Sequence, residues 1–441
     1  MSDKPSMDTF VSLCKRRGFI FQSSEIYGGI GGFWDYGPLG VEMKNSIKQN
    51  WWRAMVQHRD DVVGLDASII MNPRVWVASG HVETFADPMV DCKDCKRRFR
   101  TDDLTPNDNG ELRCPECGGE LTDSRMFNLM FKTYVGPVAD EASVVYLRPE
   151  TAQAMFVNFD NVLTTTRRKL PFGIAQIGRS FRNEITPGNF IFRDREFEQM
   201  EMEYFVMPGT DEDWHDRWIE ERFNWWLGLG VRKENLQIRE HTKEELSHYS
   251  KRTVDIEYDF PFAGFAEIEG IANRTNFDLK QHEQHAGRTL QYFDEPSGEH
   301  VVPFVIEPAM GVDRCFLTVL IDAYAEEEVK GEKRVVLRLK PELAPVKVAV
   351  LPLSRNEQLA PTARKVWDLL RPHFMTQFDD AQSIGRRYRR QDEIGTPYCV
   401  TVDFDTLEDE AVTIRDRDEM TQDRVPMANL VSALRDKLGG C

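Results

Sequence analysis

The sequence predicts an α+β protein with a large domain over residues 1–340 and a smaller α/β domain over residues 346–441. Two observations lead to this prediction. Gly173–Phe181 and Phe197–Val206 have strand character, and the loop between them contains Thr186-Pro187-Gly188-Asn189, which is typical of an antiparallel hairpin with a long connection. After a charged segment with two prolines at 330–345, strand and helix patterns alternate to the end of the chain. A chain of 441 residues is long enough for two to four domains.

The first clear element is a helix that follows Gly37-Pro38, since proline suits the first helical position. Leu39, Met43, Ile47, Trp51 and Met55 recur every four residues and form one apolar stripe, which favours a core helix and leaves a dimer interface open. In the large domain we also expect strands at Val62–Met71, Val254–Glu269 and Pro303–Glu307, and helices at 210–228 and 311–325. In the small domain we expect strands at 346–353 and 398–404, and helices at 362–370, 383–391 and 427–438.

The composition favours a globular protein without a membrane span. Apolar residues make up 41% and aromatic residues 11% of the chain, too much for a disordered chain. No apolar run approaches the roughly 18–20 residues that cross a bilayer. The net charge of −17 argues against a basic nucleic-acid coat protein, although local clusters such as Arg386-Arg387 and Arg389-Arg390 leave room for a nucleic-acid enzyme. Because Met1–Pro5 has no apolar region, we expect a cytoplasmic location.

Four of the eight cysteines form a metal-binding pattern. Cys92 and Cys95 make one CxxC pair, Cys114 and Cys117 make another, and 18 residues separate the pairs. Four thiolates satisfy the tetrahedral coordination of Zn²⁺ and leave no open position. We therefore expect a structural zinc ribbon at about 91–122; two exposed thiol turns are the alternative.

The hairpin carries the most informative chemistry. Phe181-Arg182-Asn183-Glu184 ends its first strand, and Phe192-Arg193-Asp194-Arg195-Glu196-Phe197-Glu198-Gln199-Met200-Glu201 begins its second. Arginine forks match phosphate oxygens, and a phenylalanine ring can stack on adenine. Strand alternation places Gln199, Glu201 and Glu203 on one face. The alternative is a charge ladder on an exposed sheet.

Two further segments support a nucleotide site. Glu307-Pro308-Ala309-Met310-Gly311-Val312-Asp313-Arg314 brings another glutamate and arginine to a strand–helix junction, and Glu267 and Glu269 have spacing suitable for Mg²⁺. The sequence has neither a GxxxxGK phosphate loop nor a GxGxxG dinucleotide fingerprint. Any nucleotide site here would therefore be built from arginines.

These segments resemble the three motifs of the class II aminoacyl-tRNA synthetases. Phe181–Glu184 is similar to motif 2, Gly311–Arg314 to motif 3, and the Pro38 helix with the strand that follows it to motif 1. Longer runs at 24–29, 34–40, 148–153, 196–201 and 269–274 resemble the bacterial homodimeric glycyl-tRNA synthetases. The resemblance covers nearly the whole chain. One departure is Ala309, where the family usually has serine after Glu-Pro.

The resemblance implies a catalytic domain with an antiparallel sheet of six to seven strands, a zinc-ribbon insertion and a mixed helical insertion at about 207–253. It also implies an anticodon-binding domain at 346–441. The implied reaction has two steps: glycine and ATP form glycyl-adenylate, and the glycyl group then passes to the 3′ end of tRNA(Gly). The implied cofactors are Mg²⁺ with ATP and structural Zn²⁺, and the implied assembly is a homodimer.

Residue roles follow from the same resemblance. Arg182 would hold the α-phosphate, Arg195 and Arg314 the outer phosphates, and Glu267 the Mg²⁺ ion. We expect catalysis from Arg182, Glu184 and Arg314. The expected ATP site is Arg182, Asn183, Glu184, Phe192, Arg193, Arg195, Phe197, Glu267, Ile268, Gly311 and Arg314. The expected glycine site is Arg100, Glu150, Phe197, Glu198, Gln199, Met200, Glu201, Glu307, Ala309 and Gly311.

Two other hypotheses were weighed against an active ligase. A catalytically inactive synthetase-like protein should lose its phosphate-binding arginines first, yet Arg182, Arg195 and Arg314 are all present. A zinc-ribbon RNA-binding module would explain 91–122 and nothing else. The sequence therefore favours the enzyme.

Overall fold

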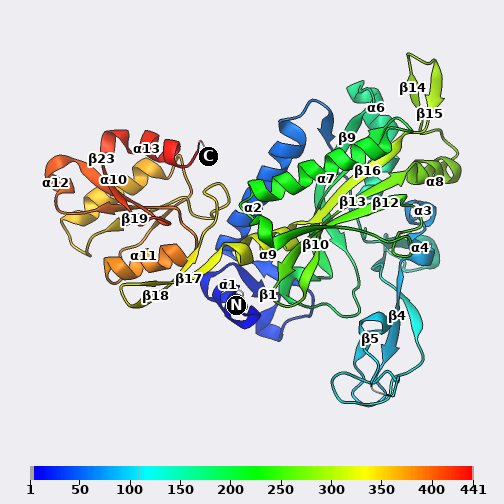
Figure 1. Cartoon of the computed structure of the whole chain (residues 1–441), viewed down its shortest axis with the longest axis horizontal. Coiled ribbons are helices and arrows are strands. Elements are labelled where there is room, and N and C mark those ends of the chain that lie inside the picture. Colours follow the sequence, from blue (N-terminus) through cyan, green and yellow to red (C-terminus); the bar gives the residue numbers. More distant parts are fainter. Residues whose placement is uncertain (1–3, 108, 440–441) are drawn as a thin grey trace.

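A seven-stranded sheet forms the centre of the large domain in the computed structural model, which describes residues 4–107 and 109–439 (Figure 1). Residues 1–3, 108 and 440–441, which belong to the expected domains, lie outside the described residues. The strand order is β11 (Leu236–Glu240), β12 (Arg252–Phe260), β13 (Gly264–Thr275), β16 (Phe304–Gly311), β10 (Glu196–Val206), β9 (Phe172–Phe181) and β3 (Val62–Gly64). All pairs are antiparallel except β3 with β9. The predicted α+β class is confirmed.

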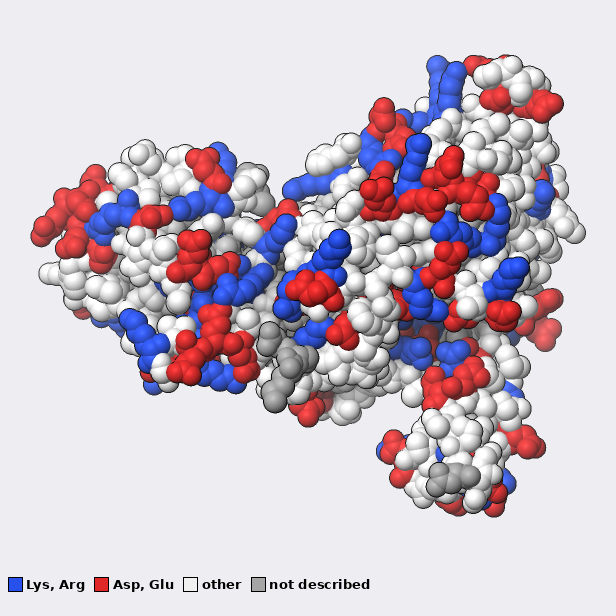
Figure 2. All heavy atoms as spheres, viewed as in Figure 1, with Lys and Arg blue, Asp and Glu red and all other residues white. Residues whose placement is uncertain are grey.

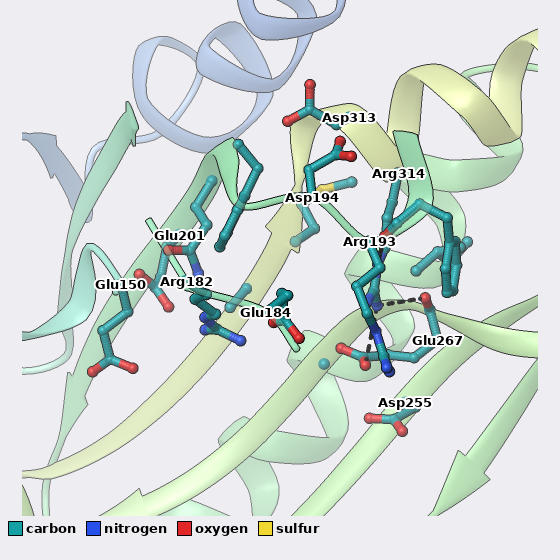
Figure 3. A pocket seen from close by; sticks show the side chains of 18 of the residues that line it. Glu150, Arg182, Glu184, Arg193, Asp194, Glu201, Asp255, Glu267, Asp313 and Arg314 are labelled. Atoms are coloured by element: carbon teal, nitrogen blue, oxygen red, sulfur yellow. Dashed lines mark hydrogen bonds and ion pairs between the residues drawn. The ribbon is translucent and has the colours of Figure 1, made fainter. Parts of the chain in front are cut away.

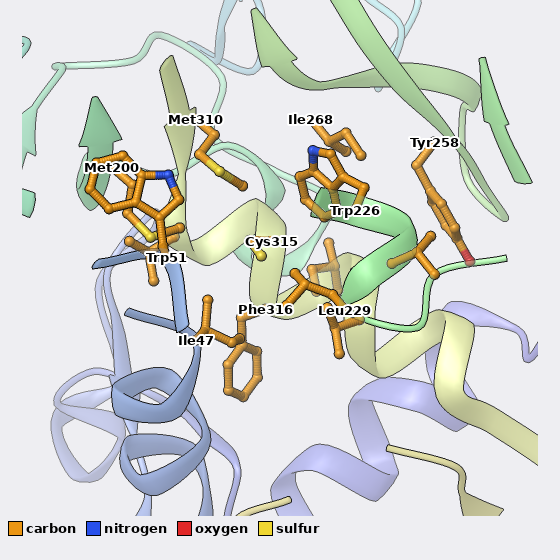
Figure 4. Packing of buried hydrophobic residues seen from close by; sticks show 14 of the residues in the cluster. Ile47, Trp51, Met200, Trp226, Leu229, Tyr258, Ile268, Met310, Cys315 and Phe316 are labelled. Atoms are coloured by element: carbon orange, nitrogen blue, oxygen red, sulfur yellow. The ribbon is translucent and has the colours of Figure 1, made fainter. Parts of the chain in front are cut away.

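Helices cover the sheet because each presents one apolar stripe to it. In α2 (Pro38–Trp52), which continues as a π-helical turn at Arg53–Gln57, the predicted stripe is buried at Met43, Ile47, Trp51 and Met55. α9 (Val312–Ala323) packs against α2 and the sheet, and it is buried along nearly its whole length. Figure 4 shows Ile47, Trp51 and Phe316 meeting Met200, Met310 and Trp226 in this core.

A buried ion pair attaches α7 (Asp211–Gly228) to the same core. Arg222 Nε donates to Glu269 Oε1 of β13 at 2.5 Å, and Trp226 Nε1 donates to Glu269 Oε2 at 2.7 Å. Because both charges are removed from water, these bonds are needed to compensate their desolvation. The tryptophans of this helix pack in the core, as the sequence predicted.

Shorter elements surround the sheet. The helices are α1 (Met7–Arg17), α3 (Pro73–Ala78), α4 (His81–Thr84), α5 (Ala152–Val157), α6 (Phe159–Thr166) and α8 (Phe277–Ala286). Two-stranded sheets pair β1 (Ile20–Gln22) with β2 (Trp34–Tyr36), β7 (Lys132–Tyr134) with β8 (Val144–Tyr146), and β14 (Tyr292–Asp294) with β15 (Glu299–Val301). Single 3₁₀ turns lie at Glu25–Tyr27, Thr101–Asp103, Glu141–Ser143, Phe190–Phe192, Lys233–Asn235 and Met427–Asn429.

The CxxC pairs lie on an arm that projects from the large domain (Figure 1). Its base is a three-stranded sheet of β4 (Ala86–Asp91), β5 (Arg98–Arg100) and β6 (Arg125–Asn128). The base of the arm thus extends slightly beyond the expected 91–122.

The small domain has a separate core and a five-stranded sheet. Its strand order is β20 (Thr376–Phe378), β19 (Val348–Pro352), β21 (Tyr398–Val402), β22 (Ala411–Asp416) and β23 (Gln422–Pro426). The helices are α10 (Leu359–Leu370), α11 (Ile384–Glu393), α12 (Thr406–Asp409) and α13 (Leu430–Lys437). Parallel pairing of β19 with β20 and β21 gives it the α/β character that the sequence predicted.

Four sequence expectations need correction. The strand expected at Val62–Met71 ends at Gly64, and the one expected at Val254–Glu269 is the hairpin of β12 and β13. The boundary expected at 330–345 begins within a hairpin of β17 (Tyr324–Val329) and β18 (Glu332–Leu337). Within the expected helical insertion at 207–253, β11 is the edge strand of the main sheet. These strands are hard to recognise from the sequence, because their alternate side chains face solvent and many of those are charged.

The basic helix α11 is largely neutralised within the protein. Arg387 is fully buried and donates to backbone carbonyls, including those of Asp380 and Gln382. Arg390 pairs with Asp379 at 2.6 Å, and Arg389 lies 3.5 Å from Asp392. Positive and negative side chains are likewise interspersed over the face in Figure 2. None of the helices within residues 4–107 and 109–439 combines the length and apolar character needed to cross a membrane.

Buried charges join the two domains. Arg334 of β18 has no exposed surface and donates to Asp392 of α11 at 2.9 Å, while Arg415 donates to the same carboxylate at 3.0 Å. Glu393 pairs with Arg16 and Arg17 of α1. These contacts hold α11 against the linking hairpin and the large domain.

We predict that Asp392→Asn lowers the free energy of unfolding by about 3–5 kcal/mol, because it leaves buried guanidinium groups without their counter-ion. Asp423→Asn, which removes an exposed pair with Lys437, should cost under about 1 kcal/mol. Urea denaturation followed by circular dichroism measures both. Equal losses in the two variants would contradict this account of the domain junction.

Candidate active site

One cavity of about 490 Å³ gathers the predicted chemistry (Figure 3). It lies over β10, β13 and β16 and beside the first turn of α9, with Asp87 and Arg100 reaching it from the arm. The strand register explains this convergence, since Glu201 faces Ala309 and Gln199 faces Gly311 on the neighbouring strand. Motifs that are far apart in the sequence therefore lie side by side in the structure.

Strand alternation decides which residues of β10 reach the cavity. Phe197, Gln199 and Glu201 line it. Glu198 and Met200, both expected in the glycine site, point to the opposite face. Glu198 pairs with Lys44 at 2.9 Å and Lys48 at 3.1 Å, and Met200 is fully buried in the core. The side chains of Glu198 and Met200 therefore do not line the cavity, because successive strand side chains point to opposite sides.

Besides Arg100, three arginines line the cavity. Arg182 donates from Nε to Pro149 O at 3.0 Å, and its guanidinium carbon lies 5.4 Å and 5.5 Å from the ring centres of Phe85 and Phe197. Arg314 stacks on Phe192 at 4.3 Å and donates to Glu267 Oε2 at 3.2 Å. Arg193 lines the same end of the cavity as Arg314.

Arg195 and Asn183 do not line this cavity. Arg195 Nη2 and Nε donate to Glu184 O at 2.8 Å and 3.0 Å, and Nη1 donates to Gly31 O at 2.8 Å. Both residues line an adjacent cavity next to the arm, together with Arg98 and Arg125. The guanidinium of Arg195, which the sequence assigned to the outer phosphates, thus donates to backbone carbonyls in this structure.

The opposite end of the cavity is acidic and contains Glu150, Glu201 and Glu307. Burial raises the pKa of Glu201 to about 8, and Glu307 and Glu150 add to the effect. Thr151 donates to Glu201 from both its amide and its hydroxyl. Burial also opposes ionisation of Glu150, but His81 and Arg274 together hold its pKa well below the usual range. The acidic end thus combines an ionised carboxylate with one that is ready to lose a proton.

The remaining expected residues also line the cavity. Burial raises the pKa of Glu184, which Arg182 partly opposes. Arg100 Nε lies 3.3 Å from Asp87 Oδ2. Phe192 packs against Phe260 and Phe262 at 5.2 Å and 5.3 Å, and Ile268, Ala309 and Gly311 complete the expected set.

Two carboxylates facing each other provide a place for a cation. Burial, and then the nearby Glu267, raise the pKa of Asp255 to about 6. Oxygens of Asp255 and Glu267 both approach the side of Gly270 where a side chain would project. Oxygen donors of this kind suit Mg²⁺.

Sequence reasoning missed several residues of the cavity, among them Phe85, Asp194, Tyr249, Asp255 and Asp313. Asp194 and Asp313 lie inside the motifs already identified, so strand and helix geometry could have found them. Burial raises the pKa of Asp194 to about 8, and the proximity of Asp313 contributes. Tyr249 carries no local signal, since contacts with distant residues place it in the site: its ring packs against Arg274 at 3.9 Å and lies beside Phe277.

The four cysteines of the arm converge on one point. Cys92 Sγ and Cys117 Sγ are 3.5 Å apart, Cys95 Sγ and Cys114 Sγ are 3.7 Å apart, and all four sulfurs lie within 4.8 Å of one another. Zinc–sulfur bonds of about 2.3 Å in a tetrahedron place sulfurs about 3.8 Å apart. The donor set and its geometry therefore fit Zn²⁺.

Comparison with known proteins agrees with this geometry. Residues 132–324 match the family described as tRNA synthetase class II core domain (G, H, P, S and T), and residues 347–437 match the family described as anticodon binding domain. Similar relatives are the glycine–tRNA ligases of Thermobifida fusca, 59% identical over 99% of both chains, and Cutibacterium acnes, 57% identical over 99% of this chain and 97% of its own. That of Treponema denticola is 54% identical over 99% of this chain and 98% of its own.

Full-length similarity at this level, together with a mainly antiparallel sheet that brings the segments resembling motifs 2 and 3 to one cavity, shows that the chain belongs to the glycine–tRNA ligase family of the class II aminoacyl-tRNA synthetases.

Proposed function

We propose that this chain activates glycine with ATP and transfers the glycyl group to the 3′ end of tRNA(Gly). One observation carries the proposal: a single cavity has arginines at one end and a buried acidic pocket at the other. Arginines suit a triphosphate, and carboxylates suit an ammonium group. The family of the chain and of its relatives agrees with this reaction.

In the first step, a glycine carboxylate oxygen bonds to the α-phosphorus and the bond to pyrophosphate breaks. Arg182 lies between the two ends of the cavity, where it can neutralise charge that develops on the α-phosphate. Because Arg195 is occupied by carbonyl oxygens, we assign the outer phosphates to Arg193 and Arg314. Phe197 would stack on adenine, and Glu184 would accept a hydrogen bond from its amino group. Most of the rate then comes from positioning and charge neutralisation.

In the second step, a ribose hydroxyl of tRNA attacks the glycyl carbonyl carbon and AMP leaves. Residues 347–437 would bind the anticodon, in keeping with their family. Glu267 and Asp255 would hold Mg²⁺, which, when bound, neutralises phosphate charge. Glu150, Glu201 and Glu307 would receive the glycine ammonium, with Arg100 and Gln199 close by.

We also propose a cytoplasmic homodimer. Ile26, Tyr27 and Ile30 are exposed apolar side chains in the segment before α2, which supports contact with a second copy of the chain. The clustered, unpaired thiols of the arm suit a reducing compartment.

We predict that Arg182→Ala lowers glycine-dependent ATP–pyrophosphate exchange on the order of 100-fold or more, because charge on the α-phosphate loses its partner. Arg179→Ala is the matched control: Arg179 is exposed on β9 and pairs with Glu196 outside the cavity. Unimpaired exchange in Arg182→Ala would contradict the assigned role. Absence of glycine-dependent exchange in the unaltered protein, or equal exchange with alanine or serine, would contradict the proposed function.

Glycine binding should release protons near neutral pH. With a pKa of about 8, Glu201 is largely protonated in the free enzyme at pH 7 and must ionise to receive an ammonium group. We predict release of up to about one proton per site at pH 7, with KM for glycine falling as pH rises from 6 to 8. Titration calorimetry in buffers of different ionisation enthalpy measures the number of protons released when glycine binds. Heats that are independent of the buffer, or release that persists in Glu201→Gln, would reject the assignment.

The arm should bind one zinc ion per chain. We predict that Cys114→Ser loses the metal, because three thiolates leave the tetrahedron incomplete, whereas Cys399→Ser retains it, since Cys399 is buried in the small domain. Elemental analysis of the purified proteins makes the comparison. An unaltered protein purified without zinc that also fails to take up added zinc would refute the ribbon.

A further inference from the structure

Glu203 is a buried carboxyl group beside the acidic pocket that the proposed mechanism does not use. It lies on β10, two residues beyond Glu201, and has no exposed surface. Neither of its side-chain oxygens has a hydrogen-bond partner among the residues that the structure describes. A carboxylate in this condition would bear the full cost of desolvation, which proteins avoid by keeping the group neutral.

The two strands beside β10 determine which residues lie across from Glu203. On one side β9 places Ile174 opposite it. On the other side, the register in which Glu201 faces Ala309 and Tyr204 faces Ile306 brings Glu307 opposite it. Carboxyl oxygens of Glu201, Glu203 and Glu307 lie within 4.8 Å of one another. Two ionised groups directly across from each other would repel, so one proton between Glu203 and Glu307 is favoured.

The nearby arginine is already engaged. Arg274 Nη1 donates to Glu307 Oε2 at 2.6 Å, while Nε and Nη2 donate to Asp278 at 2.8 Å each. Besides Glu307, the charged groups that act on Glu203 are Arg274, Glu201 on its own strand and Asp278 on α8. Burial raises the pKa of Glu203 well above its ordinary value, Glu307 adds to the effect, and Arg274 only partly opposes it. Burial likewise raises the pKa of Glu307, whereas Arg274 and the adjacent carboxyl group of Glu203 act in the opposite direction.

We propose that Glu203 remains protonated throughout the reaction and is a positioning residue, whose O–H donates to the Glu307 carboxylate and orients it toward the substrate ammonium. This inference rests on the proposed function of the pocket. Glu307 then has two fixed donors, Arg274 and Glu203, and its remaining lone pairs face the cavity. Because Ala309 supplies no hydroxyl, the orientation of the glutamates determines how well three ammonium N–H groups are received.

Two variants of similar length separate a neutral donor from a negative charge. Glu203→Gln keeps an N–H donor without charge, whereas Glu203→Met keeps the shape without a donor. We expect Glu203→Gln to retain KM for glycine within about twofold, and Glu203→Met to raise it about tenfold with little change in kcat or in KM for ATP. Equal loss in both variants, or no loss in Glu203→Met, would overturn the proposal.

Infrared spectroscopy provides a readout that does not depend on activity or on Glu203→Met folding. A protonated carboxylic acid has its own C=O stretch, and the difference between the unaltered protein and Glu203→Gln should contain that band at pH 7. The band should persist with saturating glycine, because Glu203 does not release its proton. A difference spectrum that contains carboxylate bands instead would refute the protonated state. Failure of glycine-dependent exchange in the unaltered protein would reject the proposed function and leave this test intact.

Discussion

The hydrogen-bonded register of β9, β10, β16 and β13 is the constraint on which the rest of the molecule depends. It sets Glu201 opposite Ala309 and Gln199 opposite Gly311, so motifs separated by more than 100 residues lie side by side on the face of the sheet that lines the cavity. On the opposite face of the same strands, Met200 and Met310 enter the core with α2, α7 and α9. A slip of one residue would exchange these two faces, burying charge and exposing the core.

Charge separation within the cavity follows from that register. Arginines approach from the loop before β10 and from α9, whereas glutamates come from the strand centres, where burial is greatest. The glutamates do not share one protonation state: Glu150 is held ionised, Glu201 has a pKa of about 8, and Glu203 is held neutral. Burial disfavours the charged form of all three; His81 and Arg274 then lower the pKa of Glu150, whereas Glu307 raises the pKa of both Glu201 and Glu203 further.

Buried charges are also paired with opposite charges or hydrogen-bond donors outside the active site. Glu269 is compensated by Arg222 and Trp226 where α7 meets the sheet, and Asp392 by Arg334 and Arg415 where the domains meet. In both places the charges fix how one element sits on another, since a displaced partner would leave an ion without compensation. Arginines that appeared in sequence as a basic surface, such as Arg387, therefore serve the fold.

The sequence alone was sufficient for the α+β class, the stripe on α2, the hairpin of β9 and β10, the CxxC pattern and the family, because these depend on local periodicity and short motifs. Only the tertiary structure decided which motif residues enter the cavity. Strand alternation directs Glu198 and Met200 to the opposite face of the sheet. The guanidinium of Arg195 donates to the carbonyls of Glu184 and Gly31. Tyr249, Asp255 and Glu203 acquired their surroundings through pairing between distant strands, and burial and pKa depend on those neighbours, which no short stretch of sequence specifies.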